Sequence, residues 1–255
     1  MRFGGNGLKD LMGQGIIIKT EGEKIMKYTT LLMDADDTIF DFEKCEYGAL
    51  KNALMDCGYE FSDEVCRQFS SINAALWKKF EKGSITRAEL RVRRFKETIV
   101  KCFEGCTDGR ADCETVADRY VKRLAEQAIL IDGALEALEK LSQHYEIYII
   151  TNGLKPVQES RFALAELDRF VKKSYISDAM GVQKPSAEYF SMVLDDIPEK
   201  DKSKLLVVGD SLTSDMQGGR NAGLDTCIYD PKGKIEMPHA LCDYRITDLM
   251  QLLSL

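Results

Sequence analysis

Short apolar runs, each followed by polar residues, most constrain the fold of this chain of 255 residues. Such runs are apolar almost throughout, which is typical of strands buried on both faces of a sheet. Segments of helical length separate the later runs, and this alternation predicts parallel β-α-β units and an α/β fold. The predicted strands are 29–35, 146–151, 174–177, 205–209 and 226–229, with a weaker one at 244–246. The predicted helices between them are 133–142, 156–167, 186–194 and 214–222.

A long interval between the first two strands, residues 41–130, interrupts this alternation. Its apolar residues fall at helical spacing, as in Ile72, Leu76 and Phe80. We therefore expect an all-helical cap at 41–130, inserted into a core formed by 26–40 and 131–255, and placed as a lid over the crevice. The expected helices lie near 44–57, 63–81, 87–103 and 111–128, divided by Gly58, Gly83 and 105–109.

The first 25 residues differ from the rest of the chain. They are rich in glycine and lack clear periodicity, so we expect residues 1–25 to be a disordered leader outside the fold, with Met26 as the natural start. Their apolar island at 16–18 is too short for the hydrophobic core of a secretory signal.

Charge and cysteine content limit the partners. With 35 Lys+Arg against 42 Asp+Glu, the net charge of −7 argues against adhesion to a nucleic acid polymer or an anionic membrane. No run approaches the about 18 apolar residues of a membrane span. The 8 cysteines form no C-x-x-C pair, which favours free thiols and a cytoplasmic location. The oligomeric state stays open.

Polar groups follow the predicted strands in a fixed order along the chain. In an open parallel sheet the carboxyl ends of the strands share one crevice, so these groups are expected to converge there. Together they offer carboxylates, a hydroxyl and a cation, which are the groups that phosphoryl transfer needs. The four signals are Asp34-Ala35-Asp36-Asp37-Thr38, Thr151-Asn152-Gly153, Lys184-Pro185, and Gly209-Asp210-Ser211 with Asp215.

The first signal places two carboxylates at the mouth of the first strand. Asp34 is the candidate nucleophile that forms an aspartyl-phosphate. Asp36 is the candidate acid/base, which protonates the leaving oxygen and then deprotonates the hydrolytic water. The alternative is an acidic turn that caps a helix, because turns favour Asp.

The middle signals are candidates for phosphate binding. Thr151 and Asn152 offer a hydroxyl and backbone N–H groups, and Gly153 permits a close approach, although Thr-Asn-Gly is also an ordinary turn. Lys184 precedes Pro185, which biases its backbone to an extended form. Its ammonium would offset negative charge at the site; a surface lysine is the alternative.

The last signal is a candidate metal site. Carboxylate oxygens suit Mg²⁺, and we expect Asp210 to bind it directly beside Asp34 and the main-chain carbonyl of Asp36. Asp215 is expected to orient a metal-bound water or Lys184. Since Asp215 begins a predicted helix, it also interacts favourably with the helix dipole.

In this order, the motifs D-A-D-D-T, T-N-G, K-P and G-D-S-L-T-S-D resemble the four motifs of the haloacid dehalogenase superfamily. The resemblance spans residues 27–255. It implies a Rossmann-like core with a helical cap, Asp34 as nucleophile, Asp36 as acid/base, Thr151 and Lys184 as phosphate ligands, and an acidic metal motif of Asp210 and Asp215.

Within the superfamily the chain resembles the pyrimidine 5′-nucleotidase group, on segments 34–40 and 73–86. That resemblance implies nucleoside monophosphates such as UMP, dUMP and dTMP as substrates. True dehalogenases lack an acid at the position of Asp36, so halide displacement is not expected.

Several cap residues have two interpretations. Trp77, the single tryptophan, could stack on a base, but packing between helices is the favoured interpretation. Arg87, Arg91 and Arg94 form one helical stripe, for which a solvated basic face is favoured over an anion site. His144 and His239 are given no role.

The sequence thus predicts a cytoplasmic, Mg²⁺-dependent phosphomonoesterase that acts through an aspartyl-phosphate, with a small-molecule phosphate ester as its substrate and a pyrimidine nucleoside monophosphate preferred. One alternative is a phosphatase for a sugar phosphate or phosphoglycolate, and a mutase is another. The alternative outside enzymes is a regulatory protein that binds a phosphate ligand without turnover.

Overall fold

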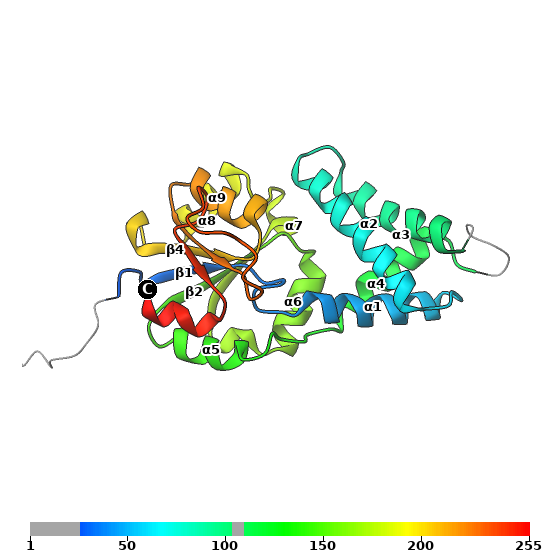
Figure 1. Cartoon of the computed structure of the whole chain (residues 1–255), viewed down its shortest axis with the longest axis horizontal. Helices are drawn as coiled ribbons and strands as arrows, with labels where there is room; N and C mark the ends of the chain where they lie inside the picture. Colours follow the sequence, from blue (N-terminus) through cyan, green and yellow to red (C-terminus); the bar gives the residue numbers. More distant parts are fainter. Residues whose placement is uncertain (1–25, 104–109) are drawn as a thin grey trace, which may run out of the picture.

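A computed structural model describes residues 26–103 and 110–255 (Figure 1). The expectation for residues 1–25 and the status of Cys106 lie outside the described residues. The seven cysteines within them are free thiols, in agreement with the sequence analysis.

A six-stranded sheet forms the core of the fold, in the order β3-β2-β1-β4-β5-β6. Each neighbouring pair of strands runs parallel. Strand β3 lies at one edge and begins before the predicted residue 174, because Lys172 and Lys173 are exposed there and hide the apolar pattern. The strands are β1 Thr30–Met33, β2 Glu146–Thr151, β3 Val171–Ile176, β4 Leu205–Gly209, β5 Asp225–Tyr229 and β6 Tyr244–Ile246.

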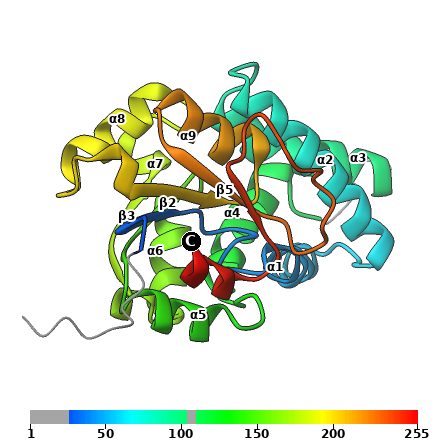
Figure 2. The same ribbon diagram turned by 60° about the vertical axis from the view of Figure 1, so that its left-hand side comes forward.

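Helices cover both faces of the sheet, as Figure 2 shows with α5 on one face and α8 and α9 on the other. Alternate side chains of β1 belong to opposite cores: Leu31 and Met33 pack on the α5 side, whereas Leu32 packs on the α8 side. This period of two is what a strand buried on both faces requires. The helices are α5 Ala134–Leu141, α6 Lys155–Leu164, α7 Ser177–Met180, α8 Ala187–Asp196 and α9 Gln217–Asn221. Short helical turns are η1 Leu167–Arg169, η2 Lys202–Lys204, η3 Leu212–Met216 and η4 Leu249–Ser254.

Four further helices are inserted between β1 and β2, and in Figure 1 they lie beyond one end of the sheet. They have a core of their own, in which Leu50, Phe69, Phe95 and Tyr120 are each 0% exposed. Their bounds are α1 Phe42–Asp56, α2 Asp63–Glu81, α3 Arg87–Phe103 and α4 Cys113–Ala125. The predicted fold class, a Rossmann-like parallel sheet with an inserted helical cap, is confirmed; the limits assigned to the domains stay a prediction.

Across the described ranges, no helix combines the length and the apolar character that crossing a membrane would require.

Candidate active site

The predicted carboxylates meet at the carboxyl end of the sheet. Asp34 follows β1, Asp210 follows β4, and Asp215 lies in η3. One oxygen from each of these three side chains lies within 4.8 Å of the others. The parallel arrangement of β1 and β4 therefore gathers residues that are far apart in the sequence, as the sequence analysis expected.

Lys184 lies inside this cluster and is 1% exposed. Its Nζ donates hydrogen bonds to Asp34 Oδ1 at 2.6 Å, to Asp215 Oδ1 at 2.6 Å and to the carbonyl of Ile150 at 2.8 Å. An ammonium group has three protons, so these contacts use its donors fully. Lys184 is thus a buried counter-charge to two carboxylates and not a surface lysine.

Asn152 explains why Lys184 enters the site. The Asn152 side chain accepts a hydrogen bond from the Lys184 backbone N–H at 2.9 Å and donates to the Lys184 carbonyl at 3.0 Å. This reciprocal pair fastens the segment before Pro185 to the end of β2. The phosphate contact expected of Asn152 stays a prediction, and these two bonds direct the Asn152 side chain toward the Lys184 backbone.

The Thr151 hydroxyl is oriented by two donors. Its Oγ1 accepts hydrogen bonds from the backbone N–H of Gly153 at 3.1 Å and from Gln158 Nε2 at 2.8 Å. A hydroxyl that accepts two bonds still has its own proton to donate. Thr151, which is 1% exposed, therefore offers an oriented donor for a phosphoryl oxygen.

Asp215 reaches the cluster because the chain turns unusually widely after β4. The Ser211 carbonyl accepts hydrogen bonds from the backbone N–H groups of both Asp215 and Met216, each at 3.1 Å. The helix predicted at 214–222 therefore begins as a π-helical turn, a geometry often found at functional sites. Gly209 leaves the room for Asp215, since a Cβ added to Gly209 would lie 2.3 Å from Asp215 Oδ2.

Burial and mutual repulsion control the protonation of the cluster. Burial, followed by the charge of Asp215, raises the pKa of Asp34 to about 8, although Lys184 opposes this shift. Burial and the charges of Asp34 and Asp215 also raise the pKa of Asp210 well above its usual range. The single ammonium of Lys184 does not balance the cluster, and a divalent cation would relieve the remaining repulsion.

Asp36 has different neighbours. Its Oδ1 accepts a hydrogen bond from Arg161 Nη1 at 2.5 Å, and its Oδ2 accepts one from Gln158 Nε2 at 2.9 Å. Arg161 and Gln158 are both 0% exposed. Gln158 Nε2 also donates to Thr151 Oγ1, so one amide links the candidate acid/base to the candidate phosphate ligand.

Gln158 and Arg161 were missed by the sequence analysis. Both lie on α6, directly after the Thr-Asn-Gly signal, and their spacing of three places them on one face of the helix. The only available signal was a polar pair on the inner face of an otherwise ordinary amphipathic helix. That pattern alone does not identify which carboxylate the pair contacts.

The inserted helices provide the other wall of the site. Trp77 packs against a small cluster that contains Leu76 and Phe80, and it also lines the cavity that includes Asp34. Packing between helices, the interpretation favoured for Trp77, therefore accounts for only part of its surroundings.

The solvated face expected for the arginine stripe is wrong for two of its three members. Arg94 is buried, with 6% exposure. Arg87 is half-buried and donates to the carbonyl of Asn152 at 3.1 Å and to Ser177 Oγ at 2.9 Å, contacts that join α3 to the core. Arg91 forms an ion pair with Asp118. The spacing indicated one helical face, but Arg87 and Arg94 on that face contact protein, whereas Arg91 pairs with an exposed carboxylate.

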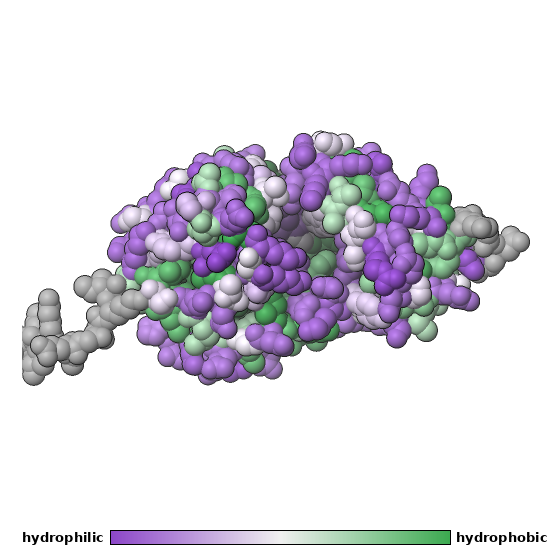
Figure 3. Space-filling model, in the orientation of Figure 1, coloured by the Kyte–Doolittle hydropathy of each residue, from purple (hydrophilic) through white to green (hydrophobic). Residues whose placement is uncertain are grey.

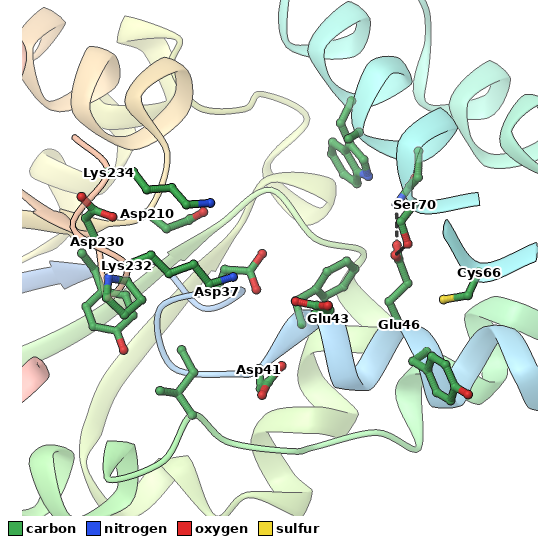
Figure 4. Close-up of a pocket in the computed structure, with 18 of the residues that line it drawn as sticks. Asp37, Asp41, Glu43, Glu46, Cys66, Ser70, Asp210, Asp230, Lys232 and Lys234 are labelled. Atoms are coloured by element: carbon green, nitrogen blue, oxygen red, sulfur yellow. Dashed lines mark hydrogen bonds between the residues drawn. The ribbon is translucent and has the colours of Figure 1, made fainter. Parts of the chain in front are cut away.

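A hollow of about 1050 Å³ opens between the sheet and the inserted helices, and Figure 3 shows it as the depression between the two. In Figure 4, Asp210, Lys232 and Lys234 lie on one side of it, on the segments that follow β4 and β5, and Glu43 lies across from them on α1. Glu46, also on α1, turns toward Ser70 instead. A cavity of about 340 Å³ lies next to it and contains Asp34, Lys184 and Thr151. This volume falls in the range of sites for small molecules.

The sequence profile of the haloacid dehalogenase-like hydrolase family matches residues 31–229, and the chain belongs to this family. The resemblance drawn from the four motifs is thereby confirmed, as is the expectation of an enzyme of the phosphatase kind.

Three relatives are similar to this chain over most of its length. The HAD-hydrolase YfnB of Bacillus subtilis is 37% identical over 226 residues, covering 89% of this chain and 94% of YfnB. The pyrimidine 5′-nucleotidase PynA of Streptococcus pneumoniae is 34% identical over 230 residues, covering 90% and 95%. The pyrimidine 5′-nucleotidase YjjG of Escherichia coli is 29% identical over 202 residues, covering 79% and 86%. The crystal structure of YfnB bound to magnesium has a TM-score of 0.82 to this chain at 36% identity, covering 89% of this chain and 98% of the other.

The donor set of this chain fits a hard divalent cation. Asp34 and Asp210 offer carboxylate oxygens, the ligands that Mg²⁺ prefers. Burial, together with the neighbouring carboxylates, raises the pKa of both groups, and a bound cation would stabilise their charged forms. Asp215 lies within the same group, but its Oδ1 is held by Lys184.

We predict that the affinity of the protein for Mg²⁺ rises with pH. A carboxyl group must lose its proton to bind a metal, and the pKa of Asp34 is about 8 without one. Protons therefore compete with Mg²⁺ at pH 6 and do so much less at pH 9. Isothermal titration calorimetry should show a smaller dissociation constant at pH 9, and Asp210→Asn should weaken binding at both values. Equal affinity at pH 6 and pH 9 would contradict the prediction.

Proposed function

We propose that this protein is a Mg²⁺-dependent phosphomonoester hydrolase that acts through an aspartyl-phosphate on Asp34. The observation that carries the proposal is the buried group in which Lys184 Nζ holds Asp34 and Asp215, with Asp210 beside them. Such a group presents a carboxylate nucleophile next to positive charge, the arrangement needed to attack a dianionic phosphate ester.

In the first step Asp34 attacks phosphorus and the bond from phosphorus to the ester oxygen breaks. Lys184 occupies Oδ1 of Asp34, which leaves Oδ2 for the attack. Thr151 donates a hydrogen bond from its hydroxyl group to a phosphoryl oxygen and keeps its proton. Bound Mg²⁺, held by Asp34 and Asp210, would supply positive charge against the phosphoryl group. Asp36 gives its proton to the leaving oxygen, which departs as an alcohol.

In the second step water attacks the phosphorus of the aspartyl-phosphate. Asp36, now a carboxylate, accepts a proton from this water, while the bond between phosphorus and Asp34 breaks. Inorganic phosphate leaves, and both carboxyl groups return to their starting states. Each oxygen of Asp36 accepts a hydrogen bond in the structure, so one of these contacts must exchange for Asp36 to reach the leaving oxygen.

A pyrimidine nucleoside 5′-monophosphate is the proposed substrate. The names of PynA and YjjG, two relatives matched over 79% or more of this chain, support this choice. The aromatic side chain of Trp77 on the cavity wall is compatible with a planar base. A sugar phosphate is the second candidate, supported by the ribulose-1,5-bisphosphate 5-phosphatase of Halopiger xanaduensis, which is 27% identical over 207 residues.

Asp34→Asn is expected to abolish phosphate release, because an amide does not replace the carboxylate nucleophile. We expect a fall in kcat of at least about a thousandfold, measured as inorganic phosphate released with Mg²⁺ present. Asp168→Asn, which changes an exposed carboxylate in η1, is the matched control and should retain full activity. Full activity in Asp34→Asn would refute the mechanism.

A substrate panel tests the proposed specificity separately. The wild-type protein should release phosphate faster from UMP and dTMP than from AMP, ribose 5-phosphate or 2-phosphoglycolate, compared as kcat/KM. Preference for ribose 5-phosphate or 2-phosphoglycolate would contradict the nucleotide assignment while leaving the mechanism intact. Tight binding of all esters without phosphate release would identify a binding protein instead.

Arg161→Lys and Gln158→Leu are predicted to slow the hydrolysis of esters with poor leaving groups more than that of esters with good leaving groups. If both residues orient Asp36, their loss should lower kcat/KM for UMP by about tenfold to a hundredfold. The same variants should change kcat/KM for 4-nitrophenyl phosphate only a few-fold, because its leaving group needs little protonation. Asp36→Asn should show the same selectivity, and Arg169→Lys, an exposed change, should show no effect. An equal fall for both esters would indicate a general structural role.

A further inference from the structure

Arg94 is a buried arginine whose hydrogen-bonding capacity is largely unused. It lies on α3 with 6% exposure, and its Nη1 donates to Asn73 Oδ1 at 3.2 Å. Among the residues described, Arg94 Nε has no hydrogen-bond partner, and Arg94 takes part in none of the ion pairs found there. A guanidinium has five N–H donors. In the part of the chain that the structure describes, Asn73 Oδ1 is the one acceptor bonded to those of Arg94, and Nε is the donor that is buried without a partner.

The surroundings hold the Arg94 side chain in place, and no carboxylate among the described residues pairs with it directly, although the charge of Glu46 partly offsets its own. Its guanidinium carbon lies 4.7 Å from the centre of the Tyr120 ring and 5.3 Å from that of Phe95. The nearest carboxylate in the hydrogen-bond network is Glu46, which is reached only through Asn73: Asn73 Nδ2 donates to Glu46 Oε1 at 2.7 Å. Ser70 Oγ donates to the other oxygen of Glu46 at 2.5 Å, the contact drawn as a dashed line in Figure 4.

The position of Arg94 relative to the catalytic groups is informative. It lines the same cavity of about 340 Å³ as Asp34, Thr151 and Lys184. A buried cation with unused donors is costly unless an acceptor meets it, because burial removes the water that would otherwise bind these donors. The phosphoryl group has its own partners at the carboxyl ends of the strands. The acceptor facing Arg94 is therefore expected on the remainder of the substrate.

We propose that Arg94 binds an acceptor oxygen on the leaving group of the substrate and thereby selects which phosphate esters are hydrolysed. The proposal rests on the phosphatase function proposed above and concerns its specificity. In a pyrimidine nucleotide the acceptor is a carbonyl oxygen of the base, and in a small acid phosphate it is a carboxylate oxygen. A simple alkyl phosphate offers no such atom.

Pairs of esters that differ in this oxygen provide the test. UMP and ribose 5-phosphate differ by the base, and 2-phosphoglycolate and ethyl phosphate differ by a carboxylate. The kinetic constants of the wild-type protein, Arg94→Gln and Arg94→Lys are measured for all four esters with Mg²⁺. The matched control is Arg93→Gln, which removes the same charge from the neighbouring position of α3, where the side chain is 45% exposed and pairs with Glu97.

One of the two pairs should contain the kind of oxygen that Arg94 binds, either a base carbonyl or a carboxylate. In that pair we expect Arg94→Gln to raise KM for the ester that carries this oxygen by about tenfold to a hundredfold, which corresponds to the loss of a hydrogen bond from a charged donor. The partner ester should change less than about threefold, within the uncertainty of such contributions. Arg94→Lys keeps the charge but loses the planar fork, and should give an intermediate loss. The responding pair distinguishes a base carbonyl from a carboxylate.

An equal loss on both members of each pair would overturn the proposal and make Arg94 a structural support for the helices. Unchanged constants would overturn it as well. Arg94→Lys keeps the test valid if Arg94→Gln does not fold, which circular dichroism and thermal unfolding check. Failure of the wild-type protein to release phosphate from all four esters would refute the phosphatase function itself, a result separate from either outcome for Arg94.

Discussion

The contact of the Lys184 ammonium with Asp34 and Asp215 is the interaction on which the site depends. Asp34 is 8% exposed and Asp215 is 0% exposed, so water does little to separate their charges. Removing one partner of a buried charge pair typically costs about 3–5 kcal/mol, because the other is left without compensation. Lys184 therefore offsets the negative charges that meet beyond the ends of β1 and β4, and Asn152 fixes Lys184 from the end of β2.

The fold class and the position of the site could be predicted from the sequence, because a parallel sheet restricts where the ends of its strands can lie. Runs apolar on both faces must become inner strands, and the carboxyl ends of such strands meet at one edge. That reasoning predicts that Asp34, Thr151 and Asp210 lie close together, and all three line one cavity in the structure. It did not yield the contacts within the site, since strand order says nothing about which donor faces which oxygen.

Helical periodicity had a different limit. It identifies the residues that share a face of a helix, but it does not tell whether the face meets solvent or protein. Arg91 and Arg94 lie on one stripe of α3, yet Arg91 pairs with Asp118 at the surface and Arg94 is enclosed by aromatic rings. The same limit applies to Gln158 and Arg161. A polar pair on an amphipathic helix ordinarily faces water, so the pattern does not predict that these two residues contact Asp36.

Helix α6 connects the chemistry on the sheet to the inserted helices. Arg161 donates through Nη1 to Asp36 and through Nε to the carbonyl of Gln127, in the segment that leads from α4 back to the sheet. Ser160, the preceding residue, donates to the carbonyl of Ala125 at 2.8 Å. Arg161 is buried, and its guanidinium carbon lies 4.2 Å from the centre of the Phe40 ring. The side chain therefore has little room to move while it contacts both Asp36 and the Gln127 carbonyl. One guanidinium therefore links the orientation of Asp36, the candidate acid/base, to the segment that connects the inserted helices to the sheet.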